Sequence, residues 1–214
     1  MKKSSLIFTC IGGLSLILFF ILSLNVLNGN LDTWNDFVYS RIALLITPAL
    51  TSFMIFIDFI GKWYVYLSVA FLLLVIPKTR KKIGMPLTFS LLLGGSLNFI
   101  LKQIFAIPRP DVYRLASASG YGHPSGHVMY GAAFIGICVL LVLKYTSKPS
   151  LKISVMVLAT AFMLLMGFNR IYLGVHTTTD VVTGYLAGIS VIIGSAFILK
   201  KLEPAGGGTY ENKD

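Results

Sequence analysis

The chain has 214 residues, of which 56% are hydrophobic and 12% are charged, and its mean hydropathy is +0.81. These values exclude a soluble protein and favour a helical membrane domain, because apolar runs of about 20 residues span a bilayer as helices. The net charge of +10 does not indicate a nucleic-acid surface, since the basic residues cluster at the ends of apolar runs, as they do in cytoplasmic loops. The clusters are Lys2-Lys3, Lys78/Arg80/Lys81/Lys82, Lys144/Lys148/Lys152 and Lys200-Lys201.

The first apolar run, from about Leu6 to Leu27, predicts a transmembrane helix. We expect it to be retained, because no small-residue cleavage site clearly follows it. The segment 31–60 is rich in aromatic and polar residues and predicts a pair of short interfacial, partly re-entrant helices. A full crossing over 43–60 is the alternative, but it would place the basic cluster at 78–82 outside, against the positive-inside bias.

The remaining helices are expected at 56–77, 83–105, 125–143, 151–168 and 178–199. Asp58 and Lys62 are four residues apart, so we expect them to pair along one helix face. The predicted fold class is therefore all-α, an integral membrane bundle of six transmembrane helices with an interfacial helical segment between helices 1 and 2. We expect one membrane domain over 1–201 and a disordered tail over 202–214, where glycines and mixed charge replace the apolar pattern.

Three polar patches punctuate this apolar chain, at 102–110, 123–127 and 169–180. The six-helix topology places both termini in the cytoplasm and all three patches on the extracytoplasmic side of the plasma membrane. A seventh crossing would keep the patches together but on the cytoplasmic side. Polar groups at the membrane edge are costly and tend to be functional.

The basic residues of the patches, other than histidine, are Lys102, Arg109 and Arg170. Phosphoryl transfer needs cations on the non-bridging oxygens, so this set favours a phosphate site. Pro108 and Pro110 stiffen the backbone on both sides of Arg109, which suits a guanidinium that binds phosphate oxygens in a fork. The alternative interpretation is that Arg109 binds lipid headgroups as a membrane anchor.

Two histidines have neighbours suited to catalysis. Ser125 and Gly126 begin a predicted helix, and its free amides favour an anion site, although ordinary helix capping explains the serine equally well. His127 then lies where a general acid is needed. His176 and Asp180 are four residues apart, so the carboxylate can hold one ring nitrogen and leave the other as a nucleophile; a structural capping pair is the alternative.

Metal chemistry is not expected. The site has no carboxylate cluster and no thiolate or histidine set spaced for zinc. We therefore predict a reaction without metal or other cofactor.

The motifs resemble a known signature. Lys102, six residues and Arg109-Pro110 form its first element, Pro124-Ser125-Gly126-His127 the second, and Asn169-Arg170, five residues, His176, three residues and Asp180 the third. Their order and spacing resemble the type-2 phosphatidic acid phosphatase family, the lipid phosphate phosphatases, which share their site with vanadium-dependent haloperoxidases. The likeness is to the bacterial membrane branch, with phosphatidylglycerophosphatase B and undecaprenyl pyrophosphate phosphatase. One departure is Asn169 in place of the usual Ser.

This resemblance implies a role for each matching residue. His176 is expected to be the nucleophile that forms a phosphohistidine, with Asp180 orienting it, and His127 to protonate the leaving oxygen. The expected phosphate cradle consists of Lys102, Arg109, Ser125, Gly126 and Arg170. His123 matches no motif position and is expected to be a rim residue.

The predicted function is hydrolysis of a membrane lipid phosphate or pyrophosphate, with phosphatidylglycerophosphate, undecaprenyl pyrophosphate and phosphatidate as candidates. The expected partners are this substrate and membrane lipids, not nucleic acid. A lipid phosphotransferase with the same site is one alternative. Another is a transporter or channel whose path is lined by Asp58, Lys62, Lys102 and Asp180. A haloperoxidase is disfavoured, because nothing in a lipid-embedded site requires vanadate.

Overall fold

The computed structural model describes residues 2–202, with side chains described for 6–200. Within this range the chain is helical and contains no strand, which confirms the predicted all-α fold. In chain order the helices are α1 (Lys2–Leu27), α2 (Asp32–Ala43), α3 (Pro48–Ile60), α4 (Trp63–Val75), α5 (Pro77–Thr79), the π-helical η1 (Arg80–Gly84), α6 (Met85–Phe105), α7 (Gly126–Tyr145), α8 (Pro149–Tyr172) and α9 (Thr178–Leu202).

Five helical segments in the described part of the chain are long and apolar enough to cross a membrane. They are Leu6–Leu27, Pro77–Phe105, Gly126–Tyr145, Pro149–Tyr172 and Thr178–Lys200. The pair α3 and α4 forms a further candidate span that is bent by 43° at the break between them. Counting this pair as one span gives the predicted six.

The prediction of one unbroken helix over 56–77 was wrong. Helix α3 begins earlier, at Pro48, where the Thr47 side chain accepts a hydrogen bond from the Leu50 amide. The helix then ends at Ile60, because Lys62 takes an extended conformation with φ −70° and ψ 140°. The expected pair of Asp58 and Lys62 does form, with 3.9 Å between Oδ2 and Nζ, but across this break.

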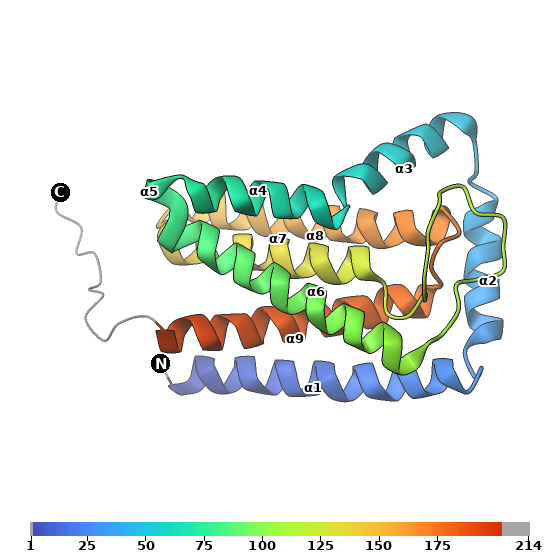
Figure 1. Cartoon of the computed structure of the whole chain (residues 1–214), viewed down its shortest axis with the longest axis horizontal. Helices are drawn as coiled ribbons and strands as arrows, with labels where there is room; N and C mark the ends of the chain where they lie inside the picture. Colours follow the sequence, from blue (N-terminus) through green and yellow to red (C-terminus); the bar gives the residue numbers. More distant parts are fainter. Residues whose placement is uncertain (1, 203–214) are drawn as a thin grey trace.

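The segment between the first two spans has one helix of the expected interfacial kind. Helix α2 runs across the end of the bundle, whereas α3 leans inward from that end to meet α4 (Figure 1). Helix α3 therefore forms a bent pair with α4, an arrangement that fits either a broken span or a re-entrant segment.

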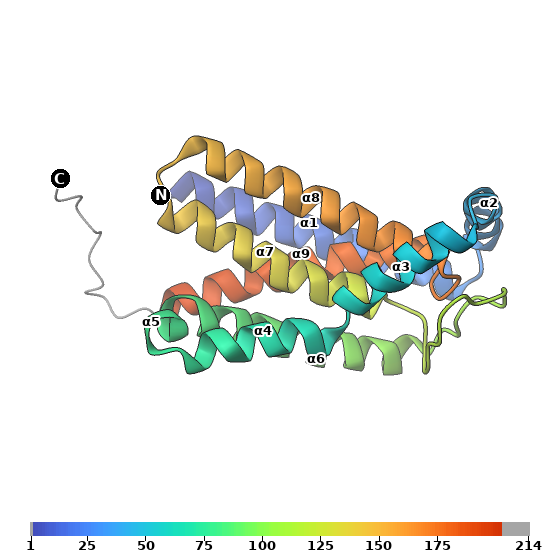
Figure 2. The ribbon, with the colours of Figure 1, turned by 90° about the horizontal axis from the view of Figure 1, so that it is seen from above.

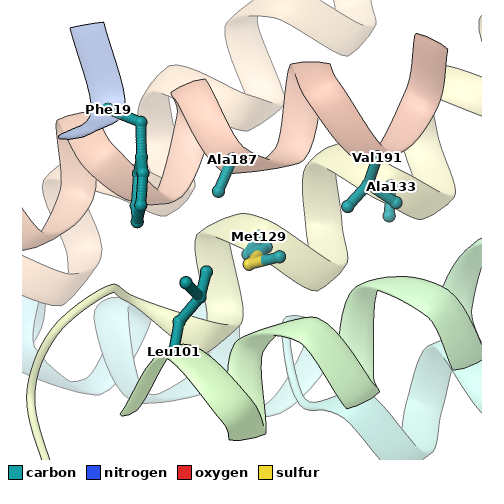
Figure 3. Close-up of a cluster of buried hydrophobic side chains, with 6 residues drawn as sticks. All are labelled: Phe19, Leu101, Met129, Ala133, Ala187 and Val191. Carbon is teal, nitrogen blue, oxygen red and sulfur yellow. The ribbon is translucent and has the colours of Figure 1, made fainter. Parts of the chain in front are cut away.

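Helices α1, α6, α7 and α9 pack around one apolar core, seen from a second direction in Figure 2. The buried side chains that meet there are Phe19, Leu101, Met129, Ala133, Ala187 and Val191 (Figure 3). Close contact between α7 and α9 requires Gly184, because a Cβ atom there would lie 2.9 Å from the Ser125 carbonyl oxygen. This contact sets the start of α7 directly against α9.

The two ends of the bundle differ in chemistry. Four segments that carry basic residues lie together at one end of the bundle (Figure 1). They are the start of α1, the end of α9, the turn from α7 to α8 and the α5 segment. At the opposite end, α2 lies together with the loop 106–125, the end of α8 and the start of α9. Helix α9 passes the expected domain boundary at 201 by one residue, and the rest of the predicted tail, 203–214, lies outside the described residues.

Candidate active site

The three polar patches converge at the α2 end of the bundle. Arg109 Nη1 lies 3.1 Å from His176 Nε2, which joins the first patch to the third. The backbone amide of Ser125 donates to the Asp180 carbonyl oxygen at 3.0 Å, which joins the second patch to the third. The structure therefore brings together residues from all three predicted motifs.

His176 and Asp180 form a buried pair at the turn between α8 and α9. His176 Nδ1 lies 3.3 Å from Asp180 Oδ2, and the Thr177 amide donates to the same oxygen at 3.0 Å. The turn requires Gly174, whose φ of +68° is left-handed and whose Cβ position lies 2.9 Å from the Tyr113 carbonyl oxygen. Because the carboxylate accepts from Nδ1–H, Nε2 carries the lone pair and faces Arg109.

Burial keeps the imidazole of His176 neutral. It lowers the pKa of His176 to about 3, and the nearby cations Arg170 and Arg109 act in the same direction while Asp180 opposes them. A neutral ring at physiological pH keeps a lone pair on Nε2, as a nucleophile requires, and in this structure that lone pair accepts a hydrogen bond from Arg109 Nη1.

Arg109 is held by backbone carbonyl groups. Its Nη1 donates to Val175 O at 2.8 Å, its Nη2 to Ser119 O at 2.9 Å and its Nε to Gly120 O at 3.1 Å. Burial lowers the pKa of Arg109, and Asp180 opposes this effect. The guanidinium therefore ties the loop 106–125 to the turn that carries His176.

Lys102 lies in the last turn of α6 and is bound to the same loop. Its Nζ donates to the carbonyl oxygens of Tyr121, at 2.5 Å, and Gly122, at 3.0 Å. The helix ends just beyond, where Ala106 takes a left-handed conformation with φ 49°. The ammonium group is thus directed into the loop that leads to Ser125.

The serine at the start of α7 does not act as a helix cap. Ser125 occupies the N-cap position, but its side chain makes no capping hydrogen bond. Its Oγ is buried without a partner among the described residues. Asn98 holds the neighbouring backbone, donating to Pro124 O at 3.2 Å and accepting from Tyr130 OH at 3.1 Å. The hydroxyl is therefore left for a ligand, which favours the anion-site interpretation over capping.

Arg170 and His127 meet at Asp58, a residue that the motif analysis did not place in the site. Arg170 is 2% exposed, and its Nη1 donates to Asp58 Oδ1. His127 Nε2 lies 3.4 Å from the same oxygen. In the part of the chain that the structure describes, Arg170 Nε and His127 Nε2 are buried without a hydrogen-bond partner. The predicted phosphate ligand Arg170 and the predicted acid His127 thus each have a buried nitrogen without a partner in the described part of the chain, beside one carboxylate.

The expectation that His123 is a rim residue was wrong. Its side chain is fully buried, with Nδ1 3.0 Å from Asp180 Oδ1 and Nε2 2.9 Å from Ser23 Oγ. Ser23 comes from α1, far outside the motif region. A polar residue within the first apolar run was the sequence signal that could have pointed to this contact.

Two asparagines connect the site to its supporting helices. Asn169, the departure from the signature, donates through Nδ2 to Met54 O at 2.5 Å and so ties α8 to α3 rather than joining the cradle. Asn35 of α2 donates to Thr179 Oγ1 at 2.9 Å and accepts from the Thr179 amide at 3.1 Å. The first turn of α9 is therefore fixed to α2.

Within the described residues, no group of three or more His, Cys, Asp or Glu side chains is placed to hold a metal ion. The cations Arg109 and Arg170 act electrostatically on His176, and Lys102 interacts with Asp180. Positive charge around this pair suits an anionic ligand.

Comparison with known proteins finds relatives of this chain. An undecaprenyl-diphosphatase from Sulfolobus acidocaldarius is 31% identical over 207 residues, covering 88% of this chain and 93% of the relative. Phosphatidylglycerophosphatase B from Bacillus subtilis is 35% identical over 94 residues, covering 44% of this chain and 46% of the relative.

Solved structures agree in fold. The crystal structure of a transmembrane PAP2-type phosphatidylglycerolphosphate phosphatase from Bacillus subtilis superposes with a TM-score of 0.79 at 25% identity, over 91% of this chain and 98% of the other. Aquifex aeolicus LpxE gives a TM-score of 0.59 at 27% identity, over 75% and 93% of the two chains. The sequence pattern of the PAP2 superfamily itself matches residues 83–203, so this chain, a multi-pass membrane protein, belongs to the PAP2 superfamily.

Proposed function

We propose that this protein hydrolyses a membrane lipid phosphate or lipid pyrophosphate through a phosphohistidine formed on His176, without a metal ion. The observation that carries the proposal is the pair of contacts on one imidazole. Nδ1 of His176 is held by Asp180, while Nε2 faces the Arg109 guanidinium. A nucleophile, its orienting carboxylate and a cation for phosphate oxygens thus meet at one ring.

In the first step the Nε2 lone pair of His176 attacks phosphorus. The P–N bond forms, and the bond from phosphorus to the leaving oxygen breaks. His127, as an imidazolium, gives its proton to that oxygen, which leaves as the lipid alcohol or, from a pyrophosphate, as the lipid monophosphate. Oδ1 of Asp58 lies 3.4 Å from His127 Nε2 and is placed to orient this ring.

In the second step neutral His127 takes a proton from a water molecule, whose oxygen attacks the phosphohistidine. The P–N bond breaks, inorganic phosphate forms, and Nε2 of His176 recovers its lone pair. Both histidines return to their starting protonation states, because the acid of the first step is the base of the second.

The transferred phosphoryl group requires donors and positive charge on its non-bridging oxygens. Ser125 Oγ and Arg170 Nε are buried and have no hydrogen-bond partner among the described residues, and we propose that they supply two such donors. Lys102, Arg109 and the Gly126 amide at the start of α7 complete the proposed cradle. Three fixed cations provide the charge that a metal ion supplies in other phosphatases, which supports a metal-independent reaction.

The relatives support a lipid as the substrate, since those named above act on undecaprenyl diphosphate and phosphatidylglycerophosphate. We infer that phosphatidylglycerophosphate, phosphatidate and undecaprenyl pyrophosphate are the substrates to test. Exposed apolar side chains on α6, among them Leu92, Phe99 and Ile104, suit contact with an acyl or prenyl tail.

We further infer that the site faces the extracytoplasmic side of the plasma membrane and that both termini are cytoplasmic. Basic segments gather at the bundle end opposite the site, and such segments favour the cytoplasmic face. A cysteine introduced at exposed Tyr113, labelled with a membrane-impermeant maleimide in intact cells, tests this orientation, with Cys10 and Cys138 replaced beforehand. Labelling only after the cells are opened would contradict it.

The function is tested with the full chain in micelles and in lipid nanodiscs, by phosphate release from the three lipids with and without EDTA. We expect release from at least one lipid and no loss of rate with EDTA. Adding glycerol as an acceptor separates hydrolysis from transfer, because a transferase would form glycerol phosphate in place of inorganic phosphate. Restoration of a lost rate by added divalent metal would contradict the proposed chemistry.

A further inference from the structure

The carboxylate of Asp180 is bound from two sides by two different histidines. Oδ2 lies 3.3 Å from His176 Nδ1, and Oδ1 lies 3.0 Å from His123 Nδ1. All three side chains are almost completely buried. The proposed nucleophile and His123 therefore share one anion, although only one of them belongs to the three motifs.

The direction of the hydrogen bonds follows from what each group can donate. An ionised carboxylate only accepts, so His123 Nδ1 carries its proton toward Asp180. The other ring nitrogen, Nε2, is then an acceptor for the Ser23 hydroxyl at 2.9 Å. A continuous line of hydrogen bonds thus runs from Ser23 through His123 and Asp180 to His176.

Aromatic side chains fix the His123 ring in this line. The ring of Phe19 stacks on it at a centroid distance of 6.3 Å and an interplanar angle of 25°, and the ring of Phe105 meets it edge-on at 5.4 Å. Phe19 and Ser23 both belong to α1, which lies outside the segment 83–203 that matches the superfamily. Helix α1 therefore supplies part of the support for the catalytic end.

We propose that His123 is a positioning residue, which holds Asp180 in the orientation that binds His176 and takes up part of its negative charge, while Ser23 fixes the tautomer of His123. The inference rests on the proposed function of His176 as the nucleophile. His123 touches none of the cradle residues through its side-chain hydrogen bonds, so its effect reaches the substrate only through Asp180 and His176.

Removing the His123 donor has two consequences. Asp180 Oδ1 becomes a buried acceptor without a partner, which favours reorientation of the carboxylate. The charge of Asp180 also acts more strongly on His176, so protonation of His176 becomes easier. The other charged or titratable groups that face His176 are Arg109, Arg170 and His127, and they are unchanged. The acid limb of the kcat profile is therefore expected to move to higher pH.

The experiment compares three variants of the full chain in nanodiscs. His123→Phe keeps an aromatic ring without a donor, and His123→Asn keeps an N–H near the position of Nδ1. We expect kcat of His123→Phe to fall about tenfold to a hundredfold, as for other outer partners of functional histidines, with little change in KM. His123→Asn should recover most of kcat and the wild-type pH profile. Ser23→Ala should show a smaller loss with the same upward movement of the acid limb.

A matched control is Ser15→Ala, a buried serine on the same helix, which should leave kcat and its pH profile unchanged. Unchanged kcat and pH profile in His123→Phe would overturn the inference. So would equal damage in His123→Asn and His123→Phe, because ring packing rather than hydrogen bonding would then explain both. If His123→Phe does not fold, Ser23→Ala decides in the same way. Acid quenching of the wild type tests the nucleophile separately: absence of a phosphohistidine would overturn the proposed function, whatever the His123 variants do.

Discussion

Asp58, near the end of α3, accepts a hydrogen bond from Arg170, near the end of α8, and thereby joins α3 to the proposed phosphate site. The same oxygen faces His127. Asp58→Asn keeps an acceptor oxygen of the same shape but removes the charge that holds Arg170 and faces His127. We expect kcat to fall about tenfold, with a smaller rise in KM, because an outer partner of catalytic groups is lost. Steady-state kinetics on a lipid phosphate measure both.

The matched control for Asp58→Asn is Asp36→Asn, an exposed acid on α2. It removes the same charge from the same end of the protein without touching Arg170 or His127. Equal kinetic effects in the two variants would show that net charge, not the contact of Asp58 with Arg170, governs the rate.

Replacement of the proposed nucleophile gives the sharpest test of the chemistry. His176→Ala should lower kcat by at least about a thousandfold, because the covalent route is lost and only binding and electrostatic effects remain. The variant should still insert into membranes, and inorganic phosphate should still bind to Arg109 and Arg170. Retention of a tenth or more of the wild-type rate in folded His176→Ala would refute the assignment.

Lowering the pH should destabilise the folded protein, because His176 is buried in its neutral form. Its pKa is about 3 in the folded protein and about 6.5 when exposed, so the unfolded chain binds more protons between these two values. The free energy of unfolding therefore falls as pH drops from 6.5 toward 3, by an amount on the order of a few kcal/mol for one group of this kind. Unfolding in detergent at pH 7, 6 and 5 measures the slope. His176→Gln, which cannot titrate, should show a shallower slope, and identical slopes would contradict the prediction.

At Gly184 we expect a substitution by alanine to change the free energy of unfolding more through packing between α7 and α9 than through helix propensity. A methyl group there would lie 2.9 Å from the Ser125 carbonyl oxygen and 3.1 Å from Val128 Cβ. Gly184→Ala should therefore destabilise the protein by about 1–3 kcal/mol and lower kcat by displacing Ser125. Gly194→Ala in the same helix meets nothing within 4 Å and should stabilise it by up to about 1 kcal/mol. Thermal unfolding and kcat of the two variants decide, and a milder effect at Gly184 would contradict the packing argument.

Much of the architecture was predictable, because long apolar runs and basic clusters are local signals. Helix α8 nevertheless runs past the expected end at 168 to Tyr172 and carries Asn169 and Arg170 inside it. The break at Gly61 was missed because apolar and aromatic residues continue on both sides of it. Hydropathy does not respond to one extended residue, and only the φ and ψ angles of Lys62 reveal the bend.

The motif residues could be selected from the sequence, whereas the contacts that support them could not. Asp58 is 112 positions from Arg170, and Ser23 is 100 positions from His123. Such pairs form only when separate helices pack, so no local pattern encodes them. His123 was taken for a rim residue because it stands beside a motif rather than within it, and its burial depends on α1 covering it.

The reciprocal hydrogen bonds between Asn35 and Thr179 fix α2 to the residue that precedes Asp180. Exposed Trp34 and Phe37 give α2 the aromatic surface of a helix that rests among lipid headgroups. We therefore expect the depth of Asp180 in the membrane to follow the headgroup layer on its own side, not the thickness of the bilayer. In membranes of different thickness the basic end of the bundle should shift, while the carboxylate should keep its distance from the nearest layer of lipid phosphates.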